Sequence, residues 1–415
     1  MTGALVVDQD PLSVGVDPTR LARLDSVLSR YVDDGRLPGW QVLVTRRGQL
    51  VHSSVYGHRD VEASLPVQLD TLWRIYSMTK PVTAVAAMTM FEEGAFSLND
   101  EVARYLPAFR DMRILRGGTP AAPKTVPATE PMRMWHLFSH TAGLTYGFTR
   151  SSLLDEIYRA AGSDFAQPRG MDLAQLCDLW ASLPLLFEPG SAWNYSVASD
   201  VLGRVLEVLS GTPLDEVFTQ RVLAPLGMTD TCWWVDGARA DRLAALYVPD
   251  PVTGKAIRHD AMSRAALSAP DFLGGGGGLI SSAADYSRFT AMLAGGGRVG
   301  DVRILAPRTL AFMTANHLPG GQSLAALARG QFAEVGYDGL GYGLGFGVLL
   351  DPVAAKLPGT VGEFTWGGAA STAFFVDPAE ELTAHFYTQL LPSSTYPVRT
   401  QLRQLIYSAL LDDPA

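Results

Sequence analysis

The spacing of apolar residues predicts the elements at the start of the chain. Asp17 and Pro18 stand where a cap and a first helical residue belong, and an apolar stripe follows them at helical spacing. We therefore expect a helix over residues 17–34. The next two runs, residues 41–45 and 49–56, flank an Arg-Arg-Gly turn and predict a β-hairpin.

The middle of the chain has a mainly helical pattern. An apolar helix is expected from Ser77 to about Glu93, and helical segments with loops continue to about Val235. Residues 116–130 are rich in Gly, Pro, Ala and Thr, which predicts a long, exposed, lid-like loop.

The pattern changes again toward the end of the chain. A helix is expected to start at Ser281 or Ser282. Three strand-like runs and a final amphipathic helix follow, at residues 342–350, 364–376, 382–388 and 396–411.

This order of elements predicts the fold class. A helix and hairpin first, helices in the middle, then strands and a helix suggest an α+β protein whose antiparallel sheet is assembled from both chain ends. We expect a discontinuous α/β domain of residues 1–85 and 240–415. A helical domain of residues 86–239 would be inserted into it, with the active site at the interface of the two.

Composition narrows the function classes. The 415 residues are 47% hydrophobic, and the formal net charge is -9 without any block of like charges. No nucleic-acid or membrane partner is therefore expected, and small-molecule chemistry fits better. Residues 1–16 lack Lys and Arg, and no apolar run reaches the ~18 residues of a spanning helix, so we expect a cytoplasmic protein. A homodimer remains open.

Several features indicate that no cofactor or metal is bound. Cys177 and Cys232 have no His or second Cys at ligand spacing, and we interpret both as reduced core thiols. The glycines at 274–278 match no nucleotide-binding motif.

The period-2 run at 341–347 predicts a closely packed strand. The chain has no Gly-x-Ser-x-Gly elbow, which argues against an α/β-hydrolase.

Ser77 and Lys80 are the strongest candidates for chemistry. They lie three residues apart at a predicted helix start, which Pro81 supports, so both side chains share one face. The helix N-terminus and burial both disfavour a charged lysine, so Lys80 could accept the serine proton. Ser-x-x-Lys alone is more often a cap with a surface lysine. Here an apolar helix follows directly, so the lysine would sit at a buried edge and need a partner.

Further segments resemble the serine β-lactamases and penicillin-binding proteins, whose first motif is Ser-x-x-Lys. The matching segments, in chain order, are His140-Thr141-Ala142-Gly143-Leu144, Trp193-Asn194-Tyr195-Ser196-Val197, the glycine-rich residues 275–285, and Trp366-Gly367-Gly368. The resemblance extends over most of the chain, from about residue 17 to 411. It is strongest to the class C branch, in particular to the family VIII carboxylesterases. The resemblance implies a β-lactamase/transpeptidase-like fold and a serine hydrolase that forms an acyl-enzyme on Ser77.

The same resemblance suggests roles for further residues. Tyr195 would relay protons with Lys80. The backbone N–H groups of Ser77 and Ala369 would form the oxyanion hole. Trp366, Gly367, Gly368 and Tyr146 would contact substrate, although packing is an equally good explanation for Tyr146. His140 is interpreted as structural.

Two departures from the lactamase pattern favour esters over β-lactams. Trp366 replaces the strand lysine that receives the β-lactam carboxylate in the family, and Val197 replaces the asparagine that helps bind the acylamide side chain. We therefore expect a carboxylesterase for short- to medium-chain acyl esters. A β-lactamase, a D-aminopeptidase, an acyltransferase of the same fold and a non-catalytic ligand-binding protein remain alternatives.

Overall fold

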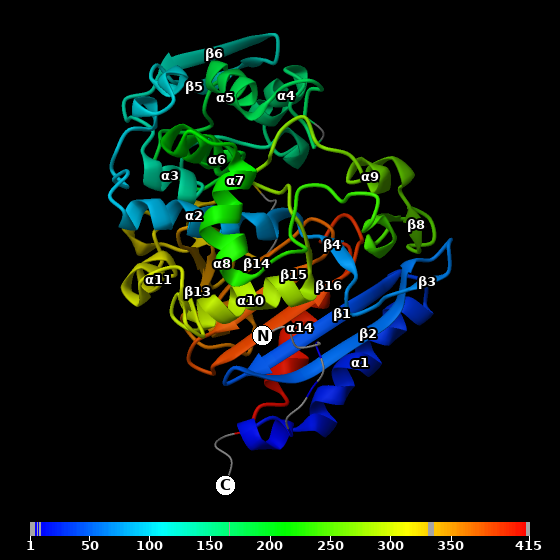
Figure 1. The fold of residues 1–415 in the computed structure, drawn as a ribbon. Helices are drawn as coiled ribbons and strands as arrows, with labels where there is room; N and C mark the ends of the chain where they lie inside the picture. The colour runs from blue at the N-terminus through cyan, green and yellow to red at the C-terminus, as the bar shows by residue number, and fades with distance from the viewer. Residues whose placement is uncertain (1–4, 6, 8–9, 166, 331–335, 412–415) are drawn as a thin grey trace.

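The computed structural model describes residues 5, 7, 10–165, 167–330 and 336–411. Its main feature is an antiparallel sheet with strand order β12-β13-β14-β15-β16-β1-β2-β3 (Figure 1). These strands are β1 (Gly39–Arg46), β2 (Gln49–Asp60), β3 (Leu65–Pro66), β12 (Leu340–Tyr342), β13 (Gly347–Leu349), β14 (Phe364–Gly367), β15 (Ala373–Asp377) and β16 (Leu382–Tyr387). Strands from both ends of the chain meet where β1 pairs with β16, so the predicted α+β sheet is confirmed.

Helices cover both faces of this sheet. Helices α1 (Pro18–Asp33) and α14 (Val398–Tyr407) pack on one face, which receives Val42 and Val44, while Leu43 points to the opposite core. Helix α10 (Ala283–Ala294) packs against β15 and β16 on that second face (Figure 1). Each fully buried Leu or Val contributes about 2 kcal/mol of hydrophobic stabilisation. The sheet therefore forms a rigid support for the elements above it.

Helix α2 (Thr79–Glu92) lies between the sheet and the helical region, and most of its side chains are buried. The helical region consists of α3 (Met134–Phe138), α4 (Leu153–Ala160), α5 (Leu173–Ser182), α6 (Ala198–Ser210), α7 (Leu214–Phe218) and α8 (Ala224–Leu226). A helix buried on all sides is apolar around its whole circumference. This burial explains why the sequence of α2 shows no polar stripe.

Smaller elements complete the described part of the chain. The short strands are β4 (Leu72–Arg74), β5 (Arg113–Thr119), β6 (Ala122–Pro127), β7 (Tyr247–Pro249), β8 (Ala256–Arg258), β9 (Ile280–Ser282), β10 (Arg298–Val299) and β11 (Val302–Arg303). The remaining α-helices are α9 (Asp260–Ala265), α11 (Pro307–Met313), α12 (Leu324–Leu327) and α13 (Pro352–Ala355). Single 3₁₀ turns occupy Pro11–Val14, Tyr76–Met78, Val102–Arg104, Pro107–Phe109, Gly147–Thr149, Ala240–Arg242 and Pro319–Gly321, and a π-helical turn occupies Thr219–Leu223. No helix within the described ranges has the length and apolar character needed to cross a membrane.

The terminal helices and the first hairpin agree with the sequence predictions. Asp17 caps α1 by accepting hydrogen bonds from the backbone N–H groups of Thr19 and Arg20. Ser282 caps α10 in the same way. The final helix is shorter than the predicted 396–411 at both ends, because α14 starts after Pro397 and ends at Tyr407.

The prediction of a loop at residues 116–130 is wrong. Most of this segment belongs to the β5–β6 hairpin, whose strand β5 is fixed by backbone hydrogen bonds to Leu185. Gly117 and Gly118 have positive φ, and the register shifts next to them. The glycines that suggested a loop therefore allow a β-bulge inside a strand pair.

Two runs predicted as single strands are each two strands joined by a turn. Residues 342–350 turn back between β12 and β13, and residues 364–376 turn back between β14 and β15. Gly345, in the first turn, has φ +94°, and a Cβ there would lie 2.5 Å from the Cβ of Ala84 on α2. The regular alternation at 341–347 thus conceals a glycine turn packed against α2.

Candidate active site

Ser77 lies in a sharp turn between a strand and α2. Strand β4 pairs with β9 and leads into the 3₁₀ turn Tyr76–Met78, after which α2 begins. Tyr76 has φ +43°, a left-handed conformation that non-glycine residues rarely adopt. The turn places Ser77 in the lining of a cavity, with 7% of the residue exposed.

Lys80 contacts Ser77 directly. Its Nζ donates to Ser77 Oγ at 3.2 Å and to the carbonyl oxygen of Gly276 at 2.6 Å. Lys80 is only 1% exposed. In the neutral amine, an N–H held by Gly276 would leave the nitrogen lone pair available to the Ser77 hydroxyl. The i, i+3 spacing at the helix start has therefore brought the two groups together as expected.

Tyr195 packs against Lys80. The Lys80 Nζ is 4.4 Å from the centre of the Tyr195 ring, and the Tyr195 hydroxyl accepts a hydrogen bond of 3.2 Å from Trp366 Nε1. Both rings are almost completely buried. The indole that replaces the expected strand lysine thus contacts Tyr195, which fixes the tyrosine next to the Ser77–Lys80 pair.

Ala369 follows directly after Trp366-Gly367-Gly368, in the turn between β14 and β15, and lines the same cavity as Ser77. Its backbone N–H donates no hydrogen bond to any residue that the structure describes. A Cβ on Gly368 would lie 2.3 Å from the carbonyl oxygen of Ile75. Only glycine therefore allows this turn to approach the segment that carries Ser77.

The cavity has a volume of about 310 Å³, and its walls combine aromatic side chains and glycines with the polar Asp164, Gln167 and Asp200. Of the residues expected to contact substrate, Tyr146 lines it, whereas Trp366, Gly367 and Gly368 do not. Its aromatic lining residues are Tyr76, Tyr146, Phe148, Phe165, Trp233 and Phe272. Such walls favour apolar groups with a few polar atoms at one end.

Asp200 is a candidate that the sequence analysis missed. It lies on α6, lines the cavity, and accepts a 2.8 Å hydrogen bond from the backbone N–H of Gly276. Burial raises the pKa of this carboxyl, while the positive charge of Lys80 opposes that rise. A Cβ on Gly276 would lie 2.5 Å from Asp200 Oδ2, so the glycine run permits this contact. The signal available in the sequence was an acidic residue near the start of α6, five residues after Tyr195.

The histidines near the site are not placed as proton carriers. His140 is fully buried, its Nδ1 lies 3.2 Å from Ser196 Oγ, and its ring packs against Tyr195. Burial holds the pKa of His140 well below its usual range and lowers that of His136 to about 3. This environment agrees with the structural interpretation of His140.

The two cysteines differ in burial. Cys177 is buried, whereas Cys232 is only partly buried, so the second does not fully match the predicted core thiol. Burial raises the pKa of both thiols. Among the described residues, no group of three His, Cys, Asp or Glu side chains is arranged to hold a metal ion.

Comparison with known proteins identifies relatives along nearly the whole chain. The beta-lactamase family model matches residues 24–408. Protein Rv1367c of Mycobacterium tuberculosis is 36% identical over 87% of this chain and 88% of its own length. Esterase EstB of Burkholderia gladioli is 34% identical over 96% of this chain and 98% of its own. The solved structure of EstCE1, described as a hydrolase with promiscuous acyltransferase activity, is 30% identical and superimposes with a TM-score of 0.79, covering 94% of this chain and 99% of that one.

Proposed function

The chain belongs to the beta-lactamase family, and on this premise we propose that it is a serine carboxylesterase that hydrolyses short- to medium-chain acyl esters. The observation that carries the proposal is the contact of Lys80 with Ser77, a residue that lines a cavity with several aromatic side chains. Two relatives of similar length support it, since EstB is named an esterase and EstCE1 a hydrolase.

The proposed reaction begins with attack of Ser77 Oγ on the ester carbonyl carbon. The serine proton passes to Lys80 Nζ, and the carbonyl π electrons move to the oxygen, which becomes an oxyanion. Collapse of this intermediate expels the alcohol, which takes up a proton delivered through Tyr195. Water then attacks the acyl-enzyme by the same route, releasing the acid and restoring the Ser77 hydroxyl.

The oxyanion would be stabilised by two backbone N–H groups, those of Ser77 and Ala369. Ala369 lines the cavity beside Ser77, and its N–H has no internal acceptor in the described chain. Donors fixed before the reaction stabilise the developing charge without reorganisation. This pair would serve both acylation and deacylation.

The cavity chemistry favours neutral esters over β-lactams. A β-lactam carries a carboxylate, and the strand position that would supply a lysine holds the buried indole of Trp366, whose N–H already bonds Tyr195. Val197 is a buried apolar side chain without hydrogen-bonding atoms. An anionic substrate would lose water in this cavity without gaining a cationic partner from either position.

Acyl transfer to an alcohol is the second candidate function. EstCE1 is described as having promiscuous acyltransferase activity, and the same acyl-enzyme would accept an alcohol in place of water. Adding methanol during ester hydrolysis and measuring the methyl ester formed would give the partition between the two acceptors.

Parallel assays with p-nitrophenyl butyrate and nitrocefin test the proposal. We expect kcat/KM to be larger for the butyrate ester, and we expect Ser77→Ala to lose both activities. A larger kcat/KM for nitrocefin would reverse the preference for esters. Ester hydrolysis that persists in Ser77→Ala would refute the assignment of the nucleophile.

A further inference from the structure

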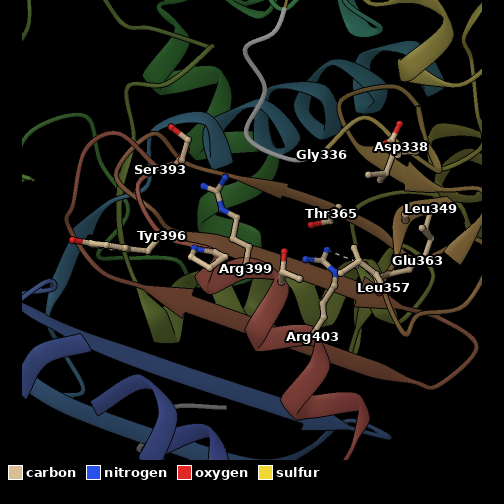
Figure 2. Close-up of a pocket in the computed structure, with 15 residues that line it drawn as sticks. Gly336, Asp338, Leu349, Leu357, Glu363, Thr365, Ser393, Tyr396, Arg399 and Arg403 are labelled. Atoms are coloured by element: carbon tan, nitrogen blue, oxygen red, sulfur yellow. Dashed lines mark hydrogen bonds and ion pairs between the residues drawn. The ribbon is translucent and has the colours of Figure 1, made fainter. Parts of the chain in front are cut away.

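The turn between β14 and β15 is held from the side opposite Ser77 by an arginine. Arg399, in the first turn of α14, donates from Nη2 to the carbonyl oxygens of Gly368 at 2.7 Å and Thr372 at 2.8 Å. Figure 2 shows Arg399 and Arg403 rising from this helix toward the sheet. The guanidinium thus binds both ends of the turn that carries Ala369.

One of these carbonyls belongs to the same peptide group as the proposed oxyanion donor. The Gly368–Ala369 peptide contains the carbonyl that Arg399 binds and the N–H that lines the cavity. This peptide is trans, so its C=O and N–H point in opposite directions within one plane. Fixing the carbonyl toward Arg399 therefore fixes the Ala369 N–H in the opposite direction.

The charge of Arg399 also acts on this peptide electronically. A hydrogen bond from a cation to a carbonyl oxygen is stronger than one between neutral groups. It polarises the peptide and makes the N–H on the other side a better donor. The carbonyl of Gly368 also accepts from the backbone N–H of Ser371 at 3.0 Å, which adds in the same direction.

Gly367 provides an independent sign that the sequence accommodates this arginine. A Cβ at Gly367 would lie 2.5 Å from both Cζ and Nη2 of Arg399. Gly368 is instead required by the close approach of Ile75. The two adjacent glycines therefore serve opposite sides of the turn, one toward Arg399 and one toward the nucleophile segment.

We propose that Arg399 is a positioning residue that orients and polarises the Gly368–Ala369 peptide of the oxyanion hole. It touches no substrate and acts only through the Ala369 N–H. The inference rests on the proposed function, because it assumes that Ser77 carries an acyl group. Loss of Arg399 should lower kcat by about tenfold, less than the ~100-fold or more expected for removing an oxyanion donor completely. KM should change little.

Infrared spectroscopy of the acyl-enzyme tests this proposal. Rapid mixing with p-nitrophenyl butyrate carrying ¹³C at the acyl carbonyl would give the stretching frequency of that carbonyl on Ser77. Weaker hydrogen bonding raises this frequency, so Arg399→Met should shift it upward. Arg399→Lys keeps the positive charge and can still donate to one of the two carbonyl oxygens. Its carbonyl frequency should therefore lie between those of Arg399→Met and the wild type.

Arg403→Met is the matched control. Arg403 lies one turn further along α14 and binds Glu363 rather than the turn, so its loss should leave the frequency and kcat of the folded enzyme unchanged. An unshifted carbonyl frequency in Arg399→Met would overturn the positioning role. If the methionine variant does not fold, an unshifted frequency in Arg399→Lys would overturn it instead. Absence of a Ser77 acyl group in the wild type would instead overturn the proposed function, and this inference with it.

Discussion

The structure contains two cavities near β14, one lined by Thr365 and Arg399 and the other by Ser77 and Ala369, and they differ in chemistry more than in size. The cavity beside α14 has a volume of about 480 Å³ and is lined by charged and polar side chains that include Asp338, Glu363, Arg399 and Arg403 (Figure 2). The cavity at Ser77 is smaller, about 310 Å³, and is lined largely by aromatic side chains and glycines. Volume alone would select the wrong one as the active site.

The difference lies in what the polar groups do. Arg403 forms a buried ion pair with Glu363 at 2.9 Å, and Arg399 is bound to two backbone carbonyls. In the smaller cavity, the lining includes Ser77, which Lys80 contacts, and Ala369, whose backbone N–H has no internal acceptor among the described residues. We therefore expect changes in the α14 cavity to affect stability, except at Arg399, which also acts on the reaction through the Gly368–Ala369 peptide. Changes in the Ser77 cavity should affect the reaction.

The largest effect is expected from Tyr195→Phe. The change removes the hydroxyl that accepts from Trp366 but keeps the ring that packs on Lys80, so folding should be preserved. Because a positioned proton donor contributes about 10²–10⁴-fold, kcat/KM for p-nitrophenyl butyrate should fall by roughly a thousandfold. Unfolding in urea should show a loss of about 1–3 kcal/mol, because the buried Trp366 N–H loses its acceptor. A loss below tenfold would remove Tyr195 from the proton relay.

Arg403→Met tests the other side of the comparison. It leaves Glu363 buried without its arginine, and breaking such a pair costs about 3 kcal/mol of unfolding free energy or more. Urea denaturation should detect this loss, while kcat/KM per folded molecule should stay close to the wild-type value. A fall in kcat/KM as large as that of Tyr195→Phe would erase the distinction between the two cavities.

Asp200→Asn is expected to have an intermediate effect on the reaction. A carboxylate close to Lys80 favours the protonated lysine, so its removal should favour the neutral base. The acidic limb of the kcat/KM profile against pH should then move to lower pH. The maximum rate should fall by roughly tenfold, because Gly276, which orients Lys80, loses a charged acceptor. An unmoved acidic limb would mean that Asp200 carries no charge in the working pH range.

The smallest effect is expected from Phe165→Ala. Phe165 is 41% exposed at the cavity wall, and its ring contacts Phe148 and Tyr76. Removing it should widen the cavity and raise the kcat/KM ratio of octanoyl to butyryl esters by roughly fivefold, a modest size for one hydrophobic contact. An unchanged ratio would place the acyl chain against another wall.

Local signals in the sequence predicted some parts of the site well. The cap at Asp17 and the i, i+3 spacing of Ser77 and Lys80 depend on neighbouring residues, and the structure contains both features. Asp200 and Arg399 act through backbone groups of segments far away in the chain, and no local pattern indicates such pairings.

Glycine caused the main errors in element prediction. In β5 it permits a bulge within a strand, and at Gly345 it forms a turn inside an alternating run. Whether a glycine serves a loop, a bulge or a close approach depends on the packed neighbour, which only the fold supplies. The domain boundaries at residues 85/86 and 239/240 stay a prediction.

The central claim is that Ser77 is the residue that becomes acylated. Labelling the full-length protein with a fluorophosphonate probe and mapping the modified peptide by mass spectrometry tests it most directly. We expect one adduct, on Ser77, that is absent from Ser77→Ala. An unlabelled wild-type protein would contradict the claim and favour a ligand-binding role for the cavity, and an adduct on another residue would contradict the site.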